Sequence, residues 1–272
     1  MGKLYTIFGG NGFVGSEIAR QLEGRGDDVA RIGRSSWPQE GSDLGEVIFT
    51  IGMTADFRNR LVETVELHVL RLHEALSRYK FESFLYLSSA RVYDGASATN
   101  EEAPLIVRPF ETDHIYNISK LAGESLCFAL GRANVRVARL SNVYGPGDVS
   151  NLFMTAVLRE AATTGHVTIG QSPQSEKDYS HVADVARSLI AVADTGRHRL
   201  YNIACGQNFT HREIADLLEA NNCRVDFREG GAVLKIPPVE VSRLHDEFGL
   251  TLSGPASHIP GLLNAYRNQR DI

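Results

Sequence analysis

The sequence has little cysteine, no long apolar run and no excess of basic residues. Its 272 residues include three cysteines, Cys127, Cys205 and Cys223, which are too few and too far apart for a disulfide framework or a metal site. We therefore expect reduced thiols, no metal and a cytoplasmic protein. No run approaches the ~20 apolar residues of a membrane helix. A net charge of −5 offers no basic surface for nucleic acid, so neither a membrane nor a nucleic acid is an expected partner.

What the sequence does have is a glycine-rich segment near its N-terminus. The apolar run at residues 5–8 leads into three glycines spaced by two residues each, and a helical pattern follows. In dinucleotide-binding folds, glycines at such positions permit a tight turn (Gly9), backbone approach to a pyrophosphate (Gly12) and close helix–strand packing (Gly15). The helix N-terminus would face the phosphates. The predicted coenzyme contacts here are Gly9, Asn11, Gly12, Phe13, Val14 and Gly15.

The end of the next predicted strand, residues 29–32, indicates which coenzyme is bound. Folds that prefer NAD carry an acid here for the ribose 2′-hydroxyl, whereas an arginine suits a 2′-phosphate. Gly33 stands where the acid is expected, and Arg34 and Ser35 follow it. Arg34 and Ser35 are therefore predicted coenzyme contacts that favour NADP(H) over NAD, although an exposed loop arginine is the alternative interpretation.

A third strand, residues 47–51, ends at Gly52, which is a further predicted coenzyme contact. Only about a dozen residues separate it from the second strand, too few for the helix and extra strand that usually lie between them. We therefore expect a parallel sheet that is trimmed at this edge.

A long amphipathic helix is predicted over residues 58–79. Its apolar positions at helical spacing are Leu61, Val65, Val69, Leu72 and Leu76. His68 and His73 lie five residues apart and off a common face, so we interpret both as surface or packing residues rather than ligands. The buried strand that follows, residues 84–87, ends at a pair of serines, Ser88 and Ser89.

Candidate catalytic groups follow that strand. Tyr116 and Lys120 are four residues apart in a predicted helix, which puts them on one face, one turn apart. A phenol with a pKa near 10 is a poor base at neutral pH, and a nearby ammonium lowers that pKa. Tyr116 could then exchange a proton with a carbinol while hydride moves to or from a nicotinamide. Ser89 would hold the same oxygen by a hydrogen bond.

These motifs, taken with several later ones, resemble the extended short-chain dehydrogenase/reductases of the NAD-dependent epimerase/dehydratase family. The matching segments are Gly9-x-x-Gly12-x-x-Gly15, Ser88-Ser89-Ala90-x-Val92-Tyr93, Tyr116-x-x-x-Lys120, residues 139–147, residues 177–186 and residues 201–206. The resemblance implies an α/β fold: a Rossmann-type doubly wound parallel sheet with a smaller C-terminal substrate-binding lobe. We expect an NAD(P)-binding domain over residues 1–150 and a substrate lobe over residues 151–272, with residues around 180–205 returning to the first domain.

The resemblance also implies roles for single residues. Tyr116 would be the acid/base, Lys120 would bind the nicotinamide ribose and Ser89 would orient the substrate. Asn142 resembles an asparagine near the sugar nucleotide, and Lys177 stands where an arginine often meets the diphosphate. The helix over residues 58–79 and the one near Tyr116 resemble those that pair in the family's dimers, so we expect a homodimer.

The predicted function is NADP(H)-dependent reduction or oxidation of a carbonyl or carbinol on a nucleotide-linked sugar. Dehydratases of the family carry Thr-Asp-Glu where this chain has Ser89-Ala90-Arg91, so 4,6-dehydration is not expected. Epimerisation by the same residues, with NAD retained, is the alternative. A coenzyme-sensing regulator without turnover is disfavoured, because Ser89, Tyr116 and Lys120 are all present.

Overall fold

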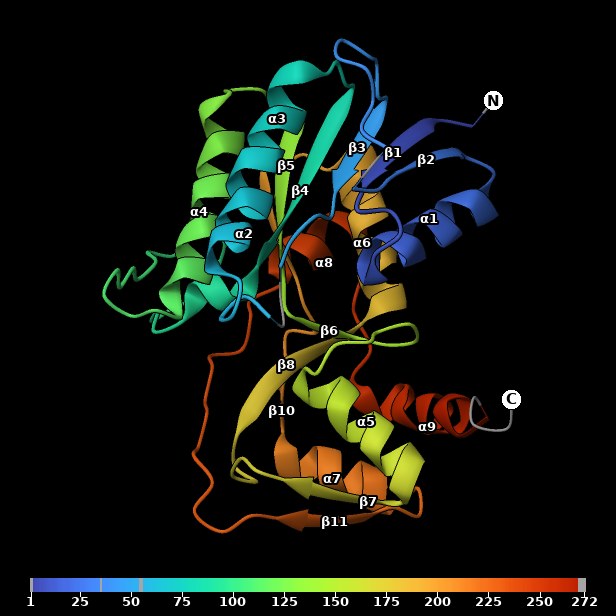
Figure 1. Cartoon of the computed structure of the whole chain (residues 1–272), viewed down its shortest axis with the longest axis vertical. Coiled ribbons are helices and arrows are strands. Elements are labelled where there is room, and N and C mark those ends of the chain that lie inside the picture. The colour runs from blue at the N-terminus through green and yellow to red at the C-terminus, as the bar shows by residue number, and fades with distance from the viewer. Residues whose placement is uncertain (1, 35, 54–55, 269–272) are drawn as a thin grey trace.

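A parallel six-stranded sheet forms the larger of two bodies in the computed structural model, which describes residues 2–34, 36–53 and 56–268 (Figure 1). The strand order is β2-β1-β3-β4-β5-β9, and every neighbouring pair is parallel. The strands are β1 (Leu4–Phe8), β2 (Asp28–Ile32), β3 (Glu46–Phe49), β4 (Ser83–Ser89), β5 (Val135–Leu140) and β9 (Leu200–Ile203). This is the predicted Rossmann-type sheet. The sheet ends at β2, and no strand of the described residues lies beyond it, which confirms the trimmed edge.

Helices cover both faces of this sheet (Figure 1). One face carries α1 (Phe13–Arg25) and α6 (Val182–Thr195), and the other carries α2 (Leu61–Val65), a π-helical turn (Glu66–Leu70), α3 (Arg71–Arg78) and α4 (His114–Ala129). The chain leaves β2 and re-enters the sheet on the other side of β1 as β3. Ligands of open α/β sheets bind beyond the carboxyl ends of the strands at such a reversal.

The smaller body has its own apolar core and lies below the first in Figure 1. Its strands are β6 (Asn142–Tyr144), β7 (His166–Ile169), β8 (Glu176–His181), β10 (Asn208–Thr210) and β11 (Arg224–Phe227), and its helices are α5 (Phe153–Thr164), α7 (His211–Glu219) and α9 (Ile259–Asn268). Within the smaller body, the three-stranded sheet β10-β8-β6 lies at the boundary between the two bodies. The strand β11 pairs with β7 further from that boundary.

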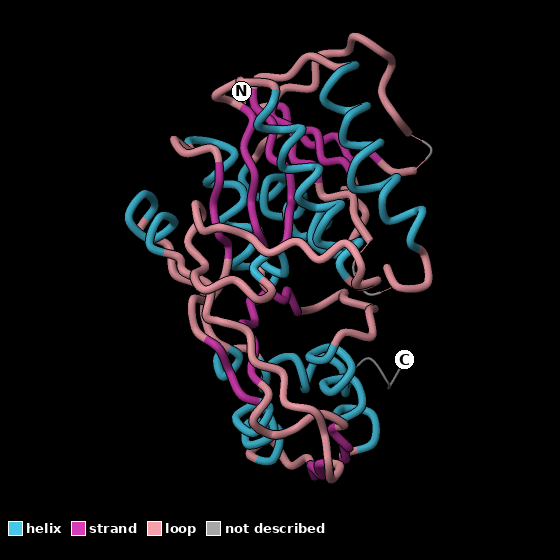
Figure 2. Tube along the Cα trace, turned by 90° about the vertical axis from the view of Figure 1, so that its left-hand side faces the viewer, coloured by secondary structure: helices cyan, strands magenta, loops and turns pink. Residues whose placement is uncertain are grey.

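The chain passes between the two bodies several times, as the turned view shows (Figure 2). It reaches the lower body after β5 and returns through α6 and β9. It returns once more at α8 (Ser242–Phe248), because Leu244 and Leu252 are buried in the core of the large sheet. The assignment of substrate binding to residues 151–272 stays a prediction.

A buried ion pair locks α4 against the sheet. Arg139 in β5 donates from Nε and Nη2 to the two carboxylate oxygens of Glu124 in α4, at 2.9 and 2.7 Å. Ser88 Oγ donates to the same carboxylate at 2.6 Å, and Arg139 Nη1 donates to the Tyr93 hydroxyl at 2.8 Å. Because each charge has several partners, the pair is satisfied inside the protein. It sets the position of the helix that carries Tyr116.

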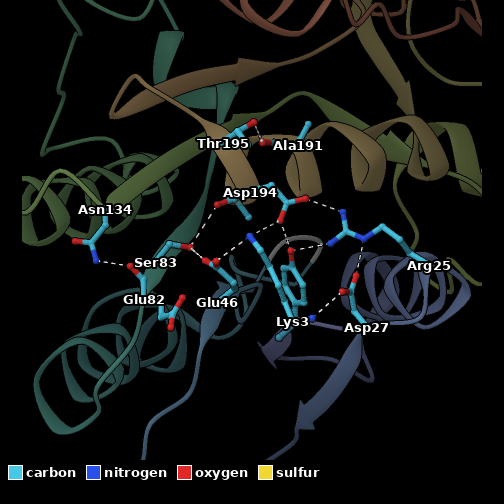
Figure 3. A network of polar contacts seen from close by, with 12 residues as sticks. Lys3, Arg25, Asp27, Glu46, Glu82, Ser83, Asn134, Ala191, Asp194 and Thr195 are labelled. Atoms are coloured by element: carbon cyan, nitrogen blue, oxygen red, sulfur yellow. Dashed lines mark hydrogen bonds and ion pairs between the residues drawn. The ribbon is translucent and has the colours of Figure 1, made fainter. Parts of the chain in front are cut away.

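A second polar network closes the opposite, amino-terminal edge of the sheet (Figure 3). Asp194 at the end of α6 accepts hydrogen bonds from the Tyr5 hydroxyl and from Arg25 Nη1, and Lys3 lies 3.5 Å away. Burial acts to raise the pKa of Asp194, but these hydrogen bonds and the charges of Arg25 and Lys3 hold it below its usual value. The network joins α1, β1 and α6 away from the glycine loop.

Candidate active site

The glycine loop connects β1 to α1 in the predicted order. Gly9 adopts a left-handed φ of +82°, and a β-carbon there would lie 2.6 Å from Thr50 Oγ1. A β-carbon on Gly15 would overlap the Gly9 carbonyl oxygen, so α1 packs against the loop more closely than any side chain allows. Gly12 caps α1 with no side-chain hydrogen bond. The first turn of α1 therefore keeps its amide donors for an anion, and this cradle fits a pyrophosphate.

The remaining predicted loop contacts lie at the start of this helix. Asn11 is exposed, while Phe13 and Val14 are half-buried in the first turn of α1. A β-carbon on Gly33 would lie 3.6 Å from Asn11 Nδ2, so the end of β2 approaches the loop. Arg34 follows and is exposed, without an ion-pair or hydrogen-bond partner within the ranges that the structure describes. Ser35 lies outside the described residues.

Tyr116 and Lys120 both lie in α4 and are both buried. The Tyr116 ring packs beside the rings of Phe57 and His68, with centroids 5.1 and 5.3 Å away. Lys120 Nζ donates to the Leu87 carbonyl oxygen in β4 at 2.8 Å. Burial lowers the pKa of Lys120 to about 7, although the charge of Glu124 acts in the opposite direction. The lysine is therefore poised between its two protonation states at neutral pH.

Gly52 follows β3 and faces the same lysine. A β-carbon at this position would lie 3.2 Å from Lys120 Nζ and 3.2 Å from His68 Nε2. Glycine thus lets the backbone after β3 pass close to the ammonium group. This proximity fits a position that contacts the coenzyme.

His68 is part of a hydrogen-bond chain that the sequence does not indicate. Its Nε2 accepts from the Met53 backbone N–H at 3.0 Å, and its Nδ1 lies 2.8 Å from Ser119 Oγ, which donates to the Tyr116 carbonyl oxygen at 2.9 Å. Because Nε2 accepts, Nδ1 carries the hydrogen and donates it. Burial, with the charge of Lys120, lowers the pKa of His68 to about 2, so the ring is neutral.

The π-helical turn explains why the spacing of apolar residues does not reveal the hydrogen bonds of His68. The predicted helix over residues 58–79 is interrupted by this turn, and its inner face at the start is formed by Thr64 and His68. Leu61, assigned to the apolar face, is exposed. The local change in helical pitch has no signal in the spacing of apolar residues.

The predicted substrate contacts come from both bodies. Ser89 ends β4, and its Oγ accepts from the Arg91 backbone N–H at 3.2 Å. Asn142 is exposed in β6, and its Nδ2 donates to the Asp178 carbonyl oxygen at 2.8 Å. Lys177 is half-buried in β8, which pairs directly with β6. Burial lowers the pKa of Lys177 most, and the charges of Arg91 and Arg58 lower it further.

Neither a metal-ligating cluster nor a membrane-spanning helix occurs among the described residues. No group of three or more His, Cys, Asp or Glu side chains in the described ranges could hold a metal ion. Within the same ranges, no helix has the length and apolarity needed to cross a bilayer.

A parallel sheet with a glycine loop at its first βα turn and a Tyr-x-x-x-Lys pair on a flanking helix defines a short-chain dehydrogenase/reductase. The chain belongs to the NAD dependent epimerase/dehydratase family, whose model matches residues 38–204. It is therefore an enzyme of the extended branch of this class, as the resemblance implied.

Relatives match over most of the chain at low identity. A dTDP-4-dehydro-6-deoxy-D-allose reductase from Streptomyces sp is 23% identical over 265 residues, covering 80% of this chain and 81% of the relative. Among solved structures, RMD from Pseudomonas aeruginosa, complexed with NADPH, has a TM-score of 0.79 at 22% identity, covering 98% of this chain and 99% of that one. MoeE5, in complex with UDP-glucose and NAD, has a TM-score of 0.79 at 23% identity, with the same coverage. These structural likenesses support the fold.

Proposed function

We propose that the chain is an NADP(H)-dependent oxidoreductase that interconverts a carbonyl and a carbinol on a nucleotide-linked sugar. The observation that carries the proposal is the placement of Tyr116 and Lys120 on α4, with Lys120 Nζ bound to Leu87 two residues before Ser89. This contact holds the acid/base pair at the end of β4 that carries the serine. The membership of the family and the reductase among its relatives agree with it.

In the proposed reaction, Ser89 Oγ and the Tyr116 hydroxyl bind the substrate oxygen. During reduction Tyr116 donates its proton to that oxygen, and during oxidation the phenolate takes it back. Protonated Lys120 stabilises the phenolate and lowers the pKa of Tyr116. A nicotinamide coenzyme, when bound, would supply or accept the hydride at the carbon. Because Tyr116 is almost fully buried beside Phe57, bulk water is kept from the proton transfer.

We assign the coenzyme as NADP(H), with NAD as the alternative. Arg34 directly follows β2, where a carboxylate would bind an unphosphorylated ribose. The loop glycines, Gly52 and Lys120 would hold the pyrophosphate and the nicotinamide end. Lys177 and Asn142 would bind the nucleotide part of the substrate from the sheet between the two bodies.

We also propose a cytoplasmic homodimer. The outer face of α2 and the π-helical turn exposes apolar side chains that nothing in the described chain covers, with Val62 85% and Leu70 61% exposed. A second copy of the same face would bury them. Sedimentation should give a dimer for the native chain and a monomer for the Val62→Lys, Leu70→Glu variant; a native monomer would contradict the proposal.

The function is tested by NADPH consumption with a panel of keto-sugar nucleotides. We expect Tyr116→Phe to lower kcat by at least about 100-fold, because it removes the transferred proton. Tyr79→Phe makes the same chemical change at a hydroxyl that donates to the Pro38 carbonyl, and should keep full turnover. Full turnover in Tyr116→Phe would overturn the mechanism. Purified protein with stoichiometric oxidised coenzyme and no net NADPH consumption would establish epimerisation instead.

A further inference from the structure

The Arg91 side chain lies near the ring of the proposed acid/base, Tyr116. Its guanidinium carbon is 5.9 Å from the centre of the Tyr116 ring and 5.1 Å from the centre of the Phe57 ring. Its backbone N–H donates to Ser89 Oγ. Arg91 therefore contacts Ser89 through its backbone and lies beside Tyr116 through its side chain, next to the two residues proposed to bind the reacting oxygen.

A second donor accompanies this guanidinium. Arg91 Nε donates to Asn117 Oδ1 at 3.2 Å, and Asn117 is the residue after Tyr116 in α4. Asn117 is 2% exposed, and its Nδ2 has no hydrogen-bond partner among the described residues. A buried amide donor without a partner costs stability unless a ligand supplies an acceptor. Asn117 is thus an independent sign that an oxygen-bearing group binds here.

The charges around Arg91 are unbalanced. Arg58 Nε donates to Asp113 Oδ1 at 2.8 Å, and Arg91 Nη2 lies 3.4 Å from the other oxygen of the same carboxylate. Lys177, whose pKa the charges of both arginines lower, has no ion-pair partner in the described ranges. Arg58 and Arg91 thus share one carboxylate, which leaves an excess of one positive charge for a ligand to neutralise.

The two cations nearest the ligand come from different parts of the fold. Lys177 projects from β8 in the sheet between the bodies, where the diphosphate is proposed to bind. Arg91 belongs to the short 3-10 turn after β4 (Ala90–Tyr93), against the ring of the acid/base. A reacting carbon lies within about 3–3.5 Å of its catalytic groups, so Arg91 faces the sugar itself. Neutral hydroxyls need no permanent cation, whereas a planar guanidinium matches a carboxylate in shape and charge.

We propose that the nucleotide-linked sugar is a uronic acid or its keto form, and that Arg91 and Asn117 bind its carboxylate. This inference rests on the proposed function and specifies its substrate class. The carboxylate accepts from the guanidinium and from Asn117 Nδ2, and holds the neighbouring carbon against Tyr116 and Ser89. A sugar with a methyl or hydroxymethyl group in that place leaves both donors without an acceptor.

The test compares ligands that differ only in the carboxylate. Calorimetry on the full chain loaded with NADP⁺ compares the affinity for UDP-glucuronic acid with that for UDP-glucose. A second comparison uses glucuronic acid 1-phosphate and glucose 1-phosphate, which removes any dependence on the nucleotide base. We expect the acid to bind at least about tenfold more tightly in each pair. In the Arg91→Gln variant the ratio of the affinity for the acid to that for the neutral sugar should fall to near one. The Arg91→Lys variant should keep part of this preference. Lys177→Met should weaken both members equally.

Arg212→Gln is the matched control, because Arg212 is an exposed arginine of α7 paired with Asp216 and Glu219, and it should leave the ratio unchanged. Equal binding of acid and neutral sugar by the native chain would overturn the inference, as would an unchanged ratio in an Arg91→Gln protein that melts at the native temperature. If neither member of either pair binds, the proposed sugar-nucleotide function fails as well. Binding without discrimination leaves that function standing and removes only the uronic acid.

Discussion

The Nδ1 atom of His68 lies 2.8 Å from the Oγ of Ser119, one turn of helix from Tyr116. Since the other imidazole nitrogen accepts from Met53, one neutral side chain joins the loop after β3 to the helix that carries the proposed acid/base. That loop includes Gly52, which faces Lys120. The histidine therefore sets the distance between the proposed nicotinamide contact and the proposed proton donor.

Replacing His68 with leucine should destabilise the fold and slow turnover. The change leaves the Met53 N–H and Ser119 Oγ without their buried partner, which costs about 1–3 kcal/mol in the free energy of unfolding. We expect kcat to fall further than substrate affinity, because the geometry around Tyr116 loosens. Urea unfolding and steady-state kinetics measure both. His73→Leu, an exposed position on α3, should stay within about 0.5 kcal/mol of the native chain; equal effects at both positions would show that the chain of hydrogen bonds is unimportant.

Lys120 should reduce the stability of the fold in a pH-dependent manner. Burial lowers its pKa to about 7 in the folded state, against about 10.4 in an unfolded chain. Between these values the unfolded chain binds the extra proton, so the contribution of Lys120 to folding becomes more favourable as pH rises. Relative to the native chain, Lys120→Met should be most stable below pH 7.

The measurement is the difference in unfolding free energy between Lys120→Met and the native chain across this range. Between about pH 7 and pH 9 the difference should shrink by about 2–3 kcal/mol, since each pH unit in the window contributes about 1.4 kcal/mol. Loss of the hydrogen bond to the Leu87 carbonyl adds an offset that does not vary with pH. A difference that stays constant with pH would mean that the lysine remains charged in the folded protein.

Two glycines of α1 should respond oppositely to alanine. Gly15→Ala forces a β-carbon against the Gly9 carbonyl oxygen, and the helix can only move away from the loop. We expect a loss of about 1–3 kcal/mol in stability and weaker NADPH binding, measured by urea unfolding and nucleotide fluorescence. At Gly24 a β-carbon would meet nothing within 4 Å. Gly24→Ala should therefore add about 0.5–1 kcal/mol of stability and leave coenzyme binding intact. The prediction fails if Gly15→Ala binds NADPH like the native chain.

Arg34→Ala should change the choice of coenzyme. A charge-assisted contact to a 2′-phosphate contributes about 1.5–3 kcal/mol, so NADPH should bind about 10- to 100-fold more weakly while NADH binding is unchanged. Arg31→Ala is the control, because Arg31 in β2 is already paired with Glu23 at 2.7 Å. A ratio of NADPH to NADH affinity that is the same in Arg34→Ala and the native chain would assign the 2′-phosphate contact elsewhere.

The predictions that the structure confirms rest on short stretches of chain. The strand–glycine–helix order at residues 5–25 and the trimmed edge after β2 follow from local periodicity and connection length. Tyr116 and Lys120 share a helix face because four residues make about one turn. The sequence allows a surface or packing role for His68, and the residue is buried, but its hydrogen bonds could not be predicted because the π-helical turn has no signal in the spacing of apolar residues. The role proposed for Asn117 could not be predicted from the sequence, because only the tertiary structure shows that this polar helix residue is buried and which groups surround it.

By itself the sequence determined the class of protein: a glycine loop, a serine-ended strand and a Tyr-x-x-x-Lys pair, in an order that specifies a coenzyme fold and predicts a proton donor. These features depend on neighbours within a few residues, which chain geometry places together whatever the rest of the molecule does. Only the tertiary structure decided what surrounds them. Three contacts join residues on separate elements: the buried pair of Glu124 and Arg139, the contact from His68 to Ser119, and the approach of Arg91 to Tyr116. Sheet order and burial create those contacts. Burial also lowers the pKa of Lys120 from its usual value to about 7.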